Sequence, residues 1–112
     1  MNDAPGRLIG SVSLSGTDAS AAIDCTRYQL SAIYTPGTIT STALTFQASA
    51  DNSTFVTVME VGGAATYSVT CSTSDYIPLD PRVFAGAQYV KIVPGSSEAS
   101  ARTITYIQRP VS

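Results

Sequence analysis

The sequence predicts an all-β protein, a single-domain antiparallel β-sandwich of about eight strands. Short segments of alternating apolar and polar residues recur along the 112 residues, and turn-forming residues separate them. Ser, Thr, Ala, Gly and Val dominate the composition, which suits closely packed strands. A chain of this length forms one domain and buries roughly two thirds of its unfolded surface, so a single core is sufficient.

Two strands are expected in the N-terminal third of the chain, at residues 8–15 and 26–34. Alternate residues of a strand point to the same face. The faces expected to be buried consist of Leu8, Val12 and Leu14 in the first strand and of Tyr28, Leu30, Ala32 and Tyr34 in the second. Pro36 and Gly37 end the second strand.

A hairpin is predicted in the middle of the chain, with strands at residues 38–49 and 54–61. Asp51, Asn52 and Ser53 form its turn, because Asp and Asn tolerate left-handed backbone and bond their own main chain. Gly62 and Gly63 end the return strand, and another strand is expected at residues 64–73. The inward side chains are expected to be Leu44, Phe46 and Ala48, then Tyr67, Val69 and Cys71, while Phe55 faces away from Val56 and Val58.

The last third is expected to contain one short helical turn near residues 81–85, followed by strands at residues 87–93 and 102–108. Asp80 suits an N-cap and Pro81 the first helical position. Phe84 is expected to close one end of the sandwich. The polar segment 94–101 is expected to be a loop.

The residue types argue against an enzyme. The chain has no histidine, which is the usual base near neutral pH. Lys91, the only lysine, lies in the middle of an expected strand, where it is expected to face or reach toward solvent. The carboxylates of Asp51, Glu60, Asp75 and Asp80 follow no pattern that would bring two together. We therefore predict no catalytic residue and no cofactor.

We also predict no metal site. With no histidine and no CxxC pair, zinc lacks its usual ligands. Residues 51–53 offer oxygen atoms to calcium, but the later acidic ligands and the glycine of an EF-hand loop are missing. A turn without a metal explains the same three residues. Cys25 and Cys71 are expected to be reduced, buried thiols, with a disulfide between them as the alternative.

Charge and hydropathy argue against two classes of partner. Only 12% of the residues are charged, and the six Lys and Arg are scattered singly, so no basic stripe exists for nucleic acid. No apolar run approaches the roughly 18 residues of a membrane-spanning helix, and the first residues lack the features of a signal peptide. We expect neither nucleic acid nor a membrane as partner. The six tyrosines are expected to pack in the core or an interface, with a sugar-stacking platform as the alternative.

Two segments resemble known families. Residues 44–55 read LTFQASADNSTF and residues 84–92 read FAGAQYVKI. They are similar to strand pairs of discoidin, or galactose-binding-like, modules, which bind carbohydrates and lipids. They also resemble small β-sandwich proteins of tailed bacteriophages that decorate or stabilise the capsid. The resemblance implies a discoidin-like or jelly-roll fold. It carries over no ligand-binding residue, because the loops GGAA and GSSEAS lack the aromatic and basic side chains common in discoidin modules.

The leading hypothesis is a non-enzymatic virion structural protein, a capsid decoration (cement) protein on the outer surface of a phage head. It would be made in the host cytoplasm without a signal peptide. The alternatives are a glycan-binding or receptor-binding module of a virion fibre and a tail or neck component. The expected partners are the major capsid protein, other virion subunits or further copies of this chain.

Residues 8–112 are expected to form the sandwich and residues 1–7 a flexible arm, with a frayed terminus as the alternative. Because arginine is favoured at interfaces, Arg7, Arg27, Arg82 and Arg109 are predicted to contact a protein partner. The alternative for each is a solvated charge.

Overall fold

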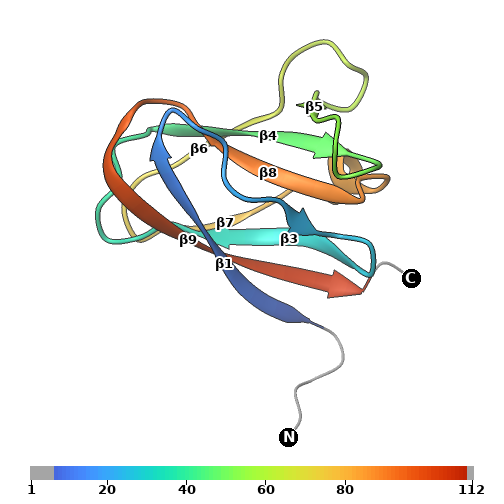
Figure 1. Ribbon diagram of the computed structural model, residues 1–112, viewed down its shortest axis with the longest axis horizontal. Coiled ribbons are helices and arrows are strands. Elements are labelled where there is room, and N and C mark those ends of the chain that lie inside the picture. The colour runs from blue at the N-terminus through green and yellow to red at the C-terminus, as the bar shows by residue number, and fades with distance from the viewer. Residues whose placement is uncertain (1–6, 111–112) are drawn as a thin grey trace, which may run out of the picture.

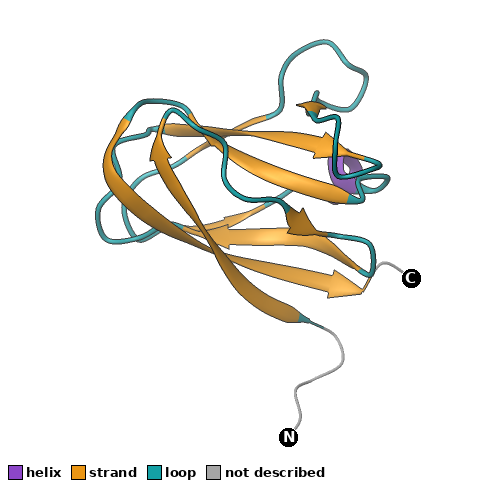
Figure 2. Ribbon diagram, in the orientation of Figure 1, coloured by secondary structure: helices purple, strands orange, loops and turns teal. Residues whose placement is uncertain are grey.

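The chain folds into two antiparallel β-sheets that pack face to face, in a computed structural model that describes residues 7–110 (Figure 1). The elements are β1 (Leu8–Gly16), β2 (Ile23–Asp24), β3 (Tyr28–Tyr34), β4 (Ala43–Ser49), β5 (Val56–Thr57), β6 (Ser68–Thr70), β7 (Tyr76–Pro78), the 3-10 turn η1 (Pro81–Phe84), β8 (Tyr89–Pro94) and β9 (Glu98–Pro110). One sheet has the order β1-β9-β3-β7 and the other the order β2-β8-β4-β5, with β6 also paired to β4. Every regular element in residues 7–110 except η1 is a strand (Figure 2). The predicted all-β antiparallel sandwich is confirmed, and the particular likeness to discoidin modules stays a prediction.

The described residues contain nine strands, where the sequence predicted about eight. β2 and β7 were not expected from the sequence. They have two and three residues, which is too short for an alternating pattern to show. In the structure they are fixed by their neighbours, because β2 pairs with β8 and β7 pairs with β3.

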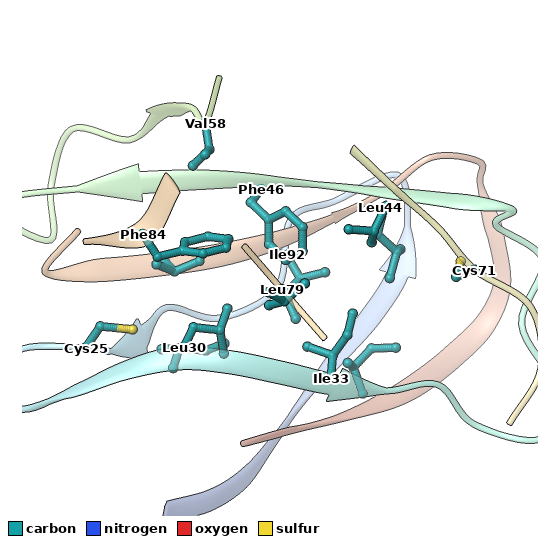
Figure 3. Close-up of a cluster of buried hydrophobic side chains, with 14 of the residues drawn as sticks. Cys25, Leu30, Ile33, Leu44, Phe46, Val58, Cys71, Leu79, Phe84 and Ile92 are labelled. Atoms are coloured by element: carbon teal, nitrogen blue, oxygen red, sulfur yellow. The ribbon is translucent and has the colours of Figure 1, made fainter. Parts of the chain in front are cut away.

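The core lies between the two sheets (Figure 3). Outside a bulge in β3, its fully buried side chains alternate along the strands, as expected for a sandwich. They include Leu14, Leu30, Ile33 and Ile104 from the first sheet and Ile23, Leu44, Phe46, Val90 and Ile92 from the second. Phe84 of η1 closes one end of the core, with its ring centroid 5.2 Å from that of Phe46. The expected role of Phe84 is therefore confirmed.

A β-bulge in β3 changes the face that the sequence predicted. Leu30 pairs with Gln108 and Ala32 with the next residue, Ile107, so Ser31 is an extra residue in β3. After the bulge, Ile33 points into the core in place of Tyr34, which is 43% exposed. The prediction that Tyr34 is buried was wrong, because strict alternation does not continue through a bulge.

The first residues of β1 are also more exposed than predicted. Leu14 is buried, but Leu8 is 45% exposed. The start of β1 reaches away from the second sheet (Figure 1), so Leu8 has no opposing sheet to pack on. Leu8 was therefore wrongly placed in the core.

The predicted turn at residues 51–53 and the predicted cap at Asp80 are confirmed. Asn52 has a left-handed backbone with φ of 60°, and the Asp51 carboxylate accepts bonds from the amides of Ser53 and Thr54, both at 2.9 Å. Asp80 caps η1 by accepting a 3.0 Å bond from the Arg82 amide.

Residues 1–6 of the predicted N-terminal arm lie outside the described residues. Within residues 7–110, no helix is long and apolar enough to cross a membrane.

Candidate protein-interaction surfaces

Three aspartates hold local turns through hydrogen bonds of their side chains. Asp24 accepts hydrogen bonds from Thr26, Asp51 from the turn that it begins, and Asp75 from the Ser72 amide at 2.9 Å. Hydrogen bonds from Thr26 lower the pKa of Asp24, and those from the Thr54 and Ser53 amides lower the pKa of Asp51. Among residues 7–110, no three acidic, cysteine or histidine side chains form a group that could hold a metal ion. These carboxylates stabilise the turns in which they lie.

The two cysteines are separate, buried thiols, the state that the sequence favoured. Burial raises the pKa of Cys25 to about 11 and also raises that of Cys71. The Cys71 thiol lies 3.3 Å from the Ser41 carbonyl oxygen, to which it donates. A thiol is nucleophilic as its anion, so neither cysteine is poised for chemistry at neutral pH.

Lys91, in the middle of β8, is half-buried. Its ammonium group lies over the Phe55 ring, 4.4 Å from the centroid. This cation–π contact attaches β8 to the segment that leads into β5.

The large apolar side chains that are exposed lie in three parts of the described chain. They are Leu8 and Ile9 at the start of β1, Tyr34 and Tyr76 on β3 and β7, and Val56, Met59 and Val61 around the β5–β6 connection. Scattered exposed apolar residues are ordinary, but adjacent ones are typical of interaction sites.

The β5–β6 connection forms a hairpin that projects from the sandwich beyond β5 (Figure 1). Met59 and Thr66 are bridged across it, and Gly62 and Gly63 turn its tip with φ values of 97° and 74°. Val56, Met59 and Val61, here called the hairpin surface, are 62%, 41% and 56% exposed. A groove of about 260 Å³ separates this hairpin from η1 and is lined by Glu60, Val61, Tyr67, Asp80, Arg82 and Val83.

A second groove, of about 460 Å³, lies beside β7 where the chain turns into η1. Its lining includes Gln29, Ser31, Tyr76, Pro78, Pro81 and Arg109, and we call it the tyrosine groove. Tyr76 is 56% exposed and packs edge-on against Tyr34, with 5.0 Å between the ring centroids. Two of the six tyrosines therefore lie on the surface, outside the core.

The structure places the four predicted contact arginines at separate positions, all exposed. Arg82 lies at the hairpin groove, where its guanidinium pairs with Asp80 at 2.9 Å. Arg109 lines the tyrosine groove. Arg7 precedes β1, Arg27 lies between β2 and β3, and neither lines these two grooves. Their role in contacting a partner stays a prediction.

The role of Glu98 was not predicted from the sequence, because Glu98 was expected to lie in a polar loop. It is only 4% exposed, and its carboxylate accepts four bonds: from the Thr40 amide at 2.9 Å, the Ser41 amide at 2.7 Å, the Ser41 hydroxyl at 2.6 Å and the Arg102 guanidinium at 3.0 Å. Burial alone would raise the pKa of Glu98, but these bonds outweigh it and lower the pKa to about 2. Glu98 thus attaches the β3–β4 connection to the start of β9, and no local sequence signal marked it.

No protein-family model and no curated protein matches this sequence. Among solved structures, the SPBc2 prophage-derived protein YomS is similar with a TM-score of 0.52 and 16% identity, over 90% of this chain and 94% of that chain. A chain from Bacillus endospore appendages, described as a novel family of disulfide-linked pili, has a TM-score of 0.41 and 14% identity, over 100% of this chain and 95% of that chain. The first similarity shows a shared fold, and the second is too weak to support an argument.

Proposed function

We propose that this chain is a non-enzymatic structural protein of a bacteriophage particle, a decoration protein that binds the outer surface of the head. The observation that carries the proposal is the hairpin surface, where three large apolar side chains close in the sequence are exposed on a part of the chain that projects from the sandwich. Exposure of an apolar side chain to water is unfavourable, so such a side chain is well suited to burial against a neighbouring subunit. A phage origin is supported by the fold that this chain shares with a prophage-derived protein.

Repetition on a symmetric shell makes a small contact surface sufficient. A head offers the same site many times, and a decoration protein that touches more than one subunit gains from high effective concentration. The low charge of the chain suits a subunit packed among neighbours. Arg82, beside the hairpin surface, is well placed to contribute a polar contact at its rim.

Binding to heads tests the proposal. Heads prepared without this chain are incubated with the purified protein and sedimented, and the bound protein is quantified. A variant with Val56, Met59 and Val61 all changed to Ser should bind about 100-fold more weakly, at about 1 kcal/mol per side chain. The matched control carries Tyr34→Ser and Tyr76→Ser and should bind as the unaltered protein does. Equal binding by the hairpin variant would overturn the proposal.

The tyrosine groove favours a second candidate, a glycan-binding module of a virion fibre. An exposed aromatic ring beside amide and guanidinium groups is a common way to hold a sugar. In this case the isolated protein binds soluble glycans, and Tyr76→Ala removes the binding while the hairpin variant keeps it. A glycan array probed with these three proteins separates the two candidates.

A further inference from the structure

The free edge of β1 differs from every other strand edge in residues 7–110. β1 is the outermost strand of its sheet, and no described strand pairs with its other side. Only Ser15 is bridged there, to Asp18, and a bulge after Leu14 ends the regular pairing with β9. The residues Leu8–Ser13, here called the β1 edge, therefore present about 20 Å of regular strand with free main-chain groups.

The other edges are blunted in ways that natural sheets commonly use. β2, β5, β6 and β7 have only two or three residues each, and Asp24 and Pro78 lie in β2 and β7. Short edges, charges and prolines all discourage pairing with another chain. Residues 8–16 read LIGSVSLSG and contain no charge and no proline, so this edge lacks all of these protections.

We infer that the β1 edge is a dimerisation site, at which β1 pairs antiparallel with β1 of a second copy of this chain. In such a symmetric pair, a charge near the two-fold axis lies close to the same charge of the partner, which disfavours pairing. The absence of charge along the whole of β1 removes this penalty. The four-stranded sheet becomes continuous with that of the partner, and dimerisation does not require the proposed role in a virion.

The side chains of β1 fit a two-fold axis near Gly10 and Ser11. Tyr106 of β9 lies over Gly10, and a Cβ at that position would be only 2.5 Å from the Tyr106 hydroxyl oxygen. Gly10 therefore leaves room for the ring at the edge of the sheet. With the axis at Gly10, Leu8 faces Val12 of the partner and Ile9 faces Ser11 of the partner. The exposed Leu8 and Ile9 thus gain neighbours across the interface. The β1 edge contributes only the six residues Leu8–Ser13 from each copy, which is fewer than in a standard stable interface, so the dimer should dissociate on dilution.

Charge reversal at Ser11 tests the inference. Ser11 is exposed, and an axis at Gly10 or Ser11 brings the two copies of this side chain near each other. In a sedimentation concentration series, the unaltered protein should reach twice the chain mass of 11.6 kDa. Ser11→Lys and Ser11→Asp should each stay monomeric, and their equimolar mixture should return to the dimer. Recovery by mixing shows that both variants are folded.

The matched control is Ser68→Lys, which changes an exposed serine on the short edge strand β6 and should dimerise normally. An unaltered protein that stays monomeric throughout the series would refute the inference. A Ser11→Lys variant that dimerises as well as Ser68→Lys would also refute it.

Discussion

Replacing Glu98 by Gln should destabilise the protein by about 3 kcal/mol at neutral pH. The four donors around Glu98 place its pKa at about 2, against an ordinary value of 4.5. Each pKa unit is worth about 1.4 kcal/mol, so the ionised carboxylate contributes about 3 kcal/mol. Each carboxylate oxygen accepts a hydrogen bond from a main-chain amide. The NH₂ group of Gln would therefore face a backbone N–H, and two donors cannot bond each other. Thermal unfolding should shift down by more than about 10 °C.

The matched control is Glu60→Gln, which makes the same chemical change on an exposed side chain. It should alter the free energy of unfolding by less than about 0.5 kcal/mol. Urea denaturation of the three proteins, followed by circular dichroism, provides the comparison. If Glu98→Gln is as stable as Glu60→Gln, the hydrogen bonds of Glu98 do not stabilise the fold.

The stabilisation by Glu98 should depend on pH in one direction. Its pKa is lower in the folded chain, so the stabilisation is complete above the unfolded pKa of about 4.5 and is lost as the pH falls toward about 2. The stability difference between the unaltered protein and Glu98→Gln should therefore shrink as the pH falls from about 5 to about 2. Asp24, Asp51 and Asp80, whose pKa values are also lowered, are present in both proteins and cancel in the difference. A difference that is constant with pH would contradict the reasoning.

Three further predictions concern the core, the β1–β9 pair and the thiols. Phe84→Ala should cost about 3 to 5 kcal/mol in urea denaturation, because it empties the closed end of the core; a cost below about 1 kcal/mol would show that η1 does not seal it. Gly10→Ala should cost about 1 to 3 kcal/mol through its clash with Tyr106, and much less in a Tyr106→Leu background; equal costs in the two backgrounds would exclude the clash as the cause. Cys25 and Cys71 should react with a thiol reagent only after unfolding, and rapid reaction of the folded protein would contradict their burial.

The parts of the fold that could be predicted from the sequence are those with a local cause. The hairpin around Asp51 follows from alternating residues on either side of a polar turn, and η1 follows from Asp80 and Pro81. Each depends on residues that are close in the chain. The burial of Phe84 was also predictable, since a large apolar side chain is usually buried in the core.

The parts that could not be predicted depend on distant residues. The bulge at Ser31 is visible only in the pairing of β3 with β9, and Ser31 itself carries no signal of it. Glu98 lies in a stretch of small polar residues, and its burial depends on Ser41, which is 57 residues away. The interaction surfaces were predicted from arginine alone. The structure adds exposed apolar side chains, among them Val56, Met59 and Val61, whose exposure follows from the projection of their hairpin.

Dimerisation at the β1 edge and head binding at the hairpin surface use different parts of the molecule. Ser11→Lys and the hairpin variant can therefore be compared in both assays. Loss of dimerisation with retained head binding would show that a monomer decorates the shell.

A structural role in the virion is tested most directly by counting this chain in native particles. Phage particles from the source are sedimented through a gradient, and the chain is quantified by mass spectrometry against the major capsid protein. A decoration protein should travel with intact heads in high copy number, in a fixed ratio set by the symmetry of the shell. Its absence from the particles, or its presence in only a few copies, would contradict a decoration role.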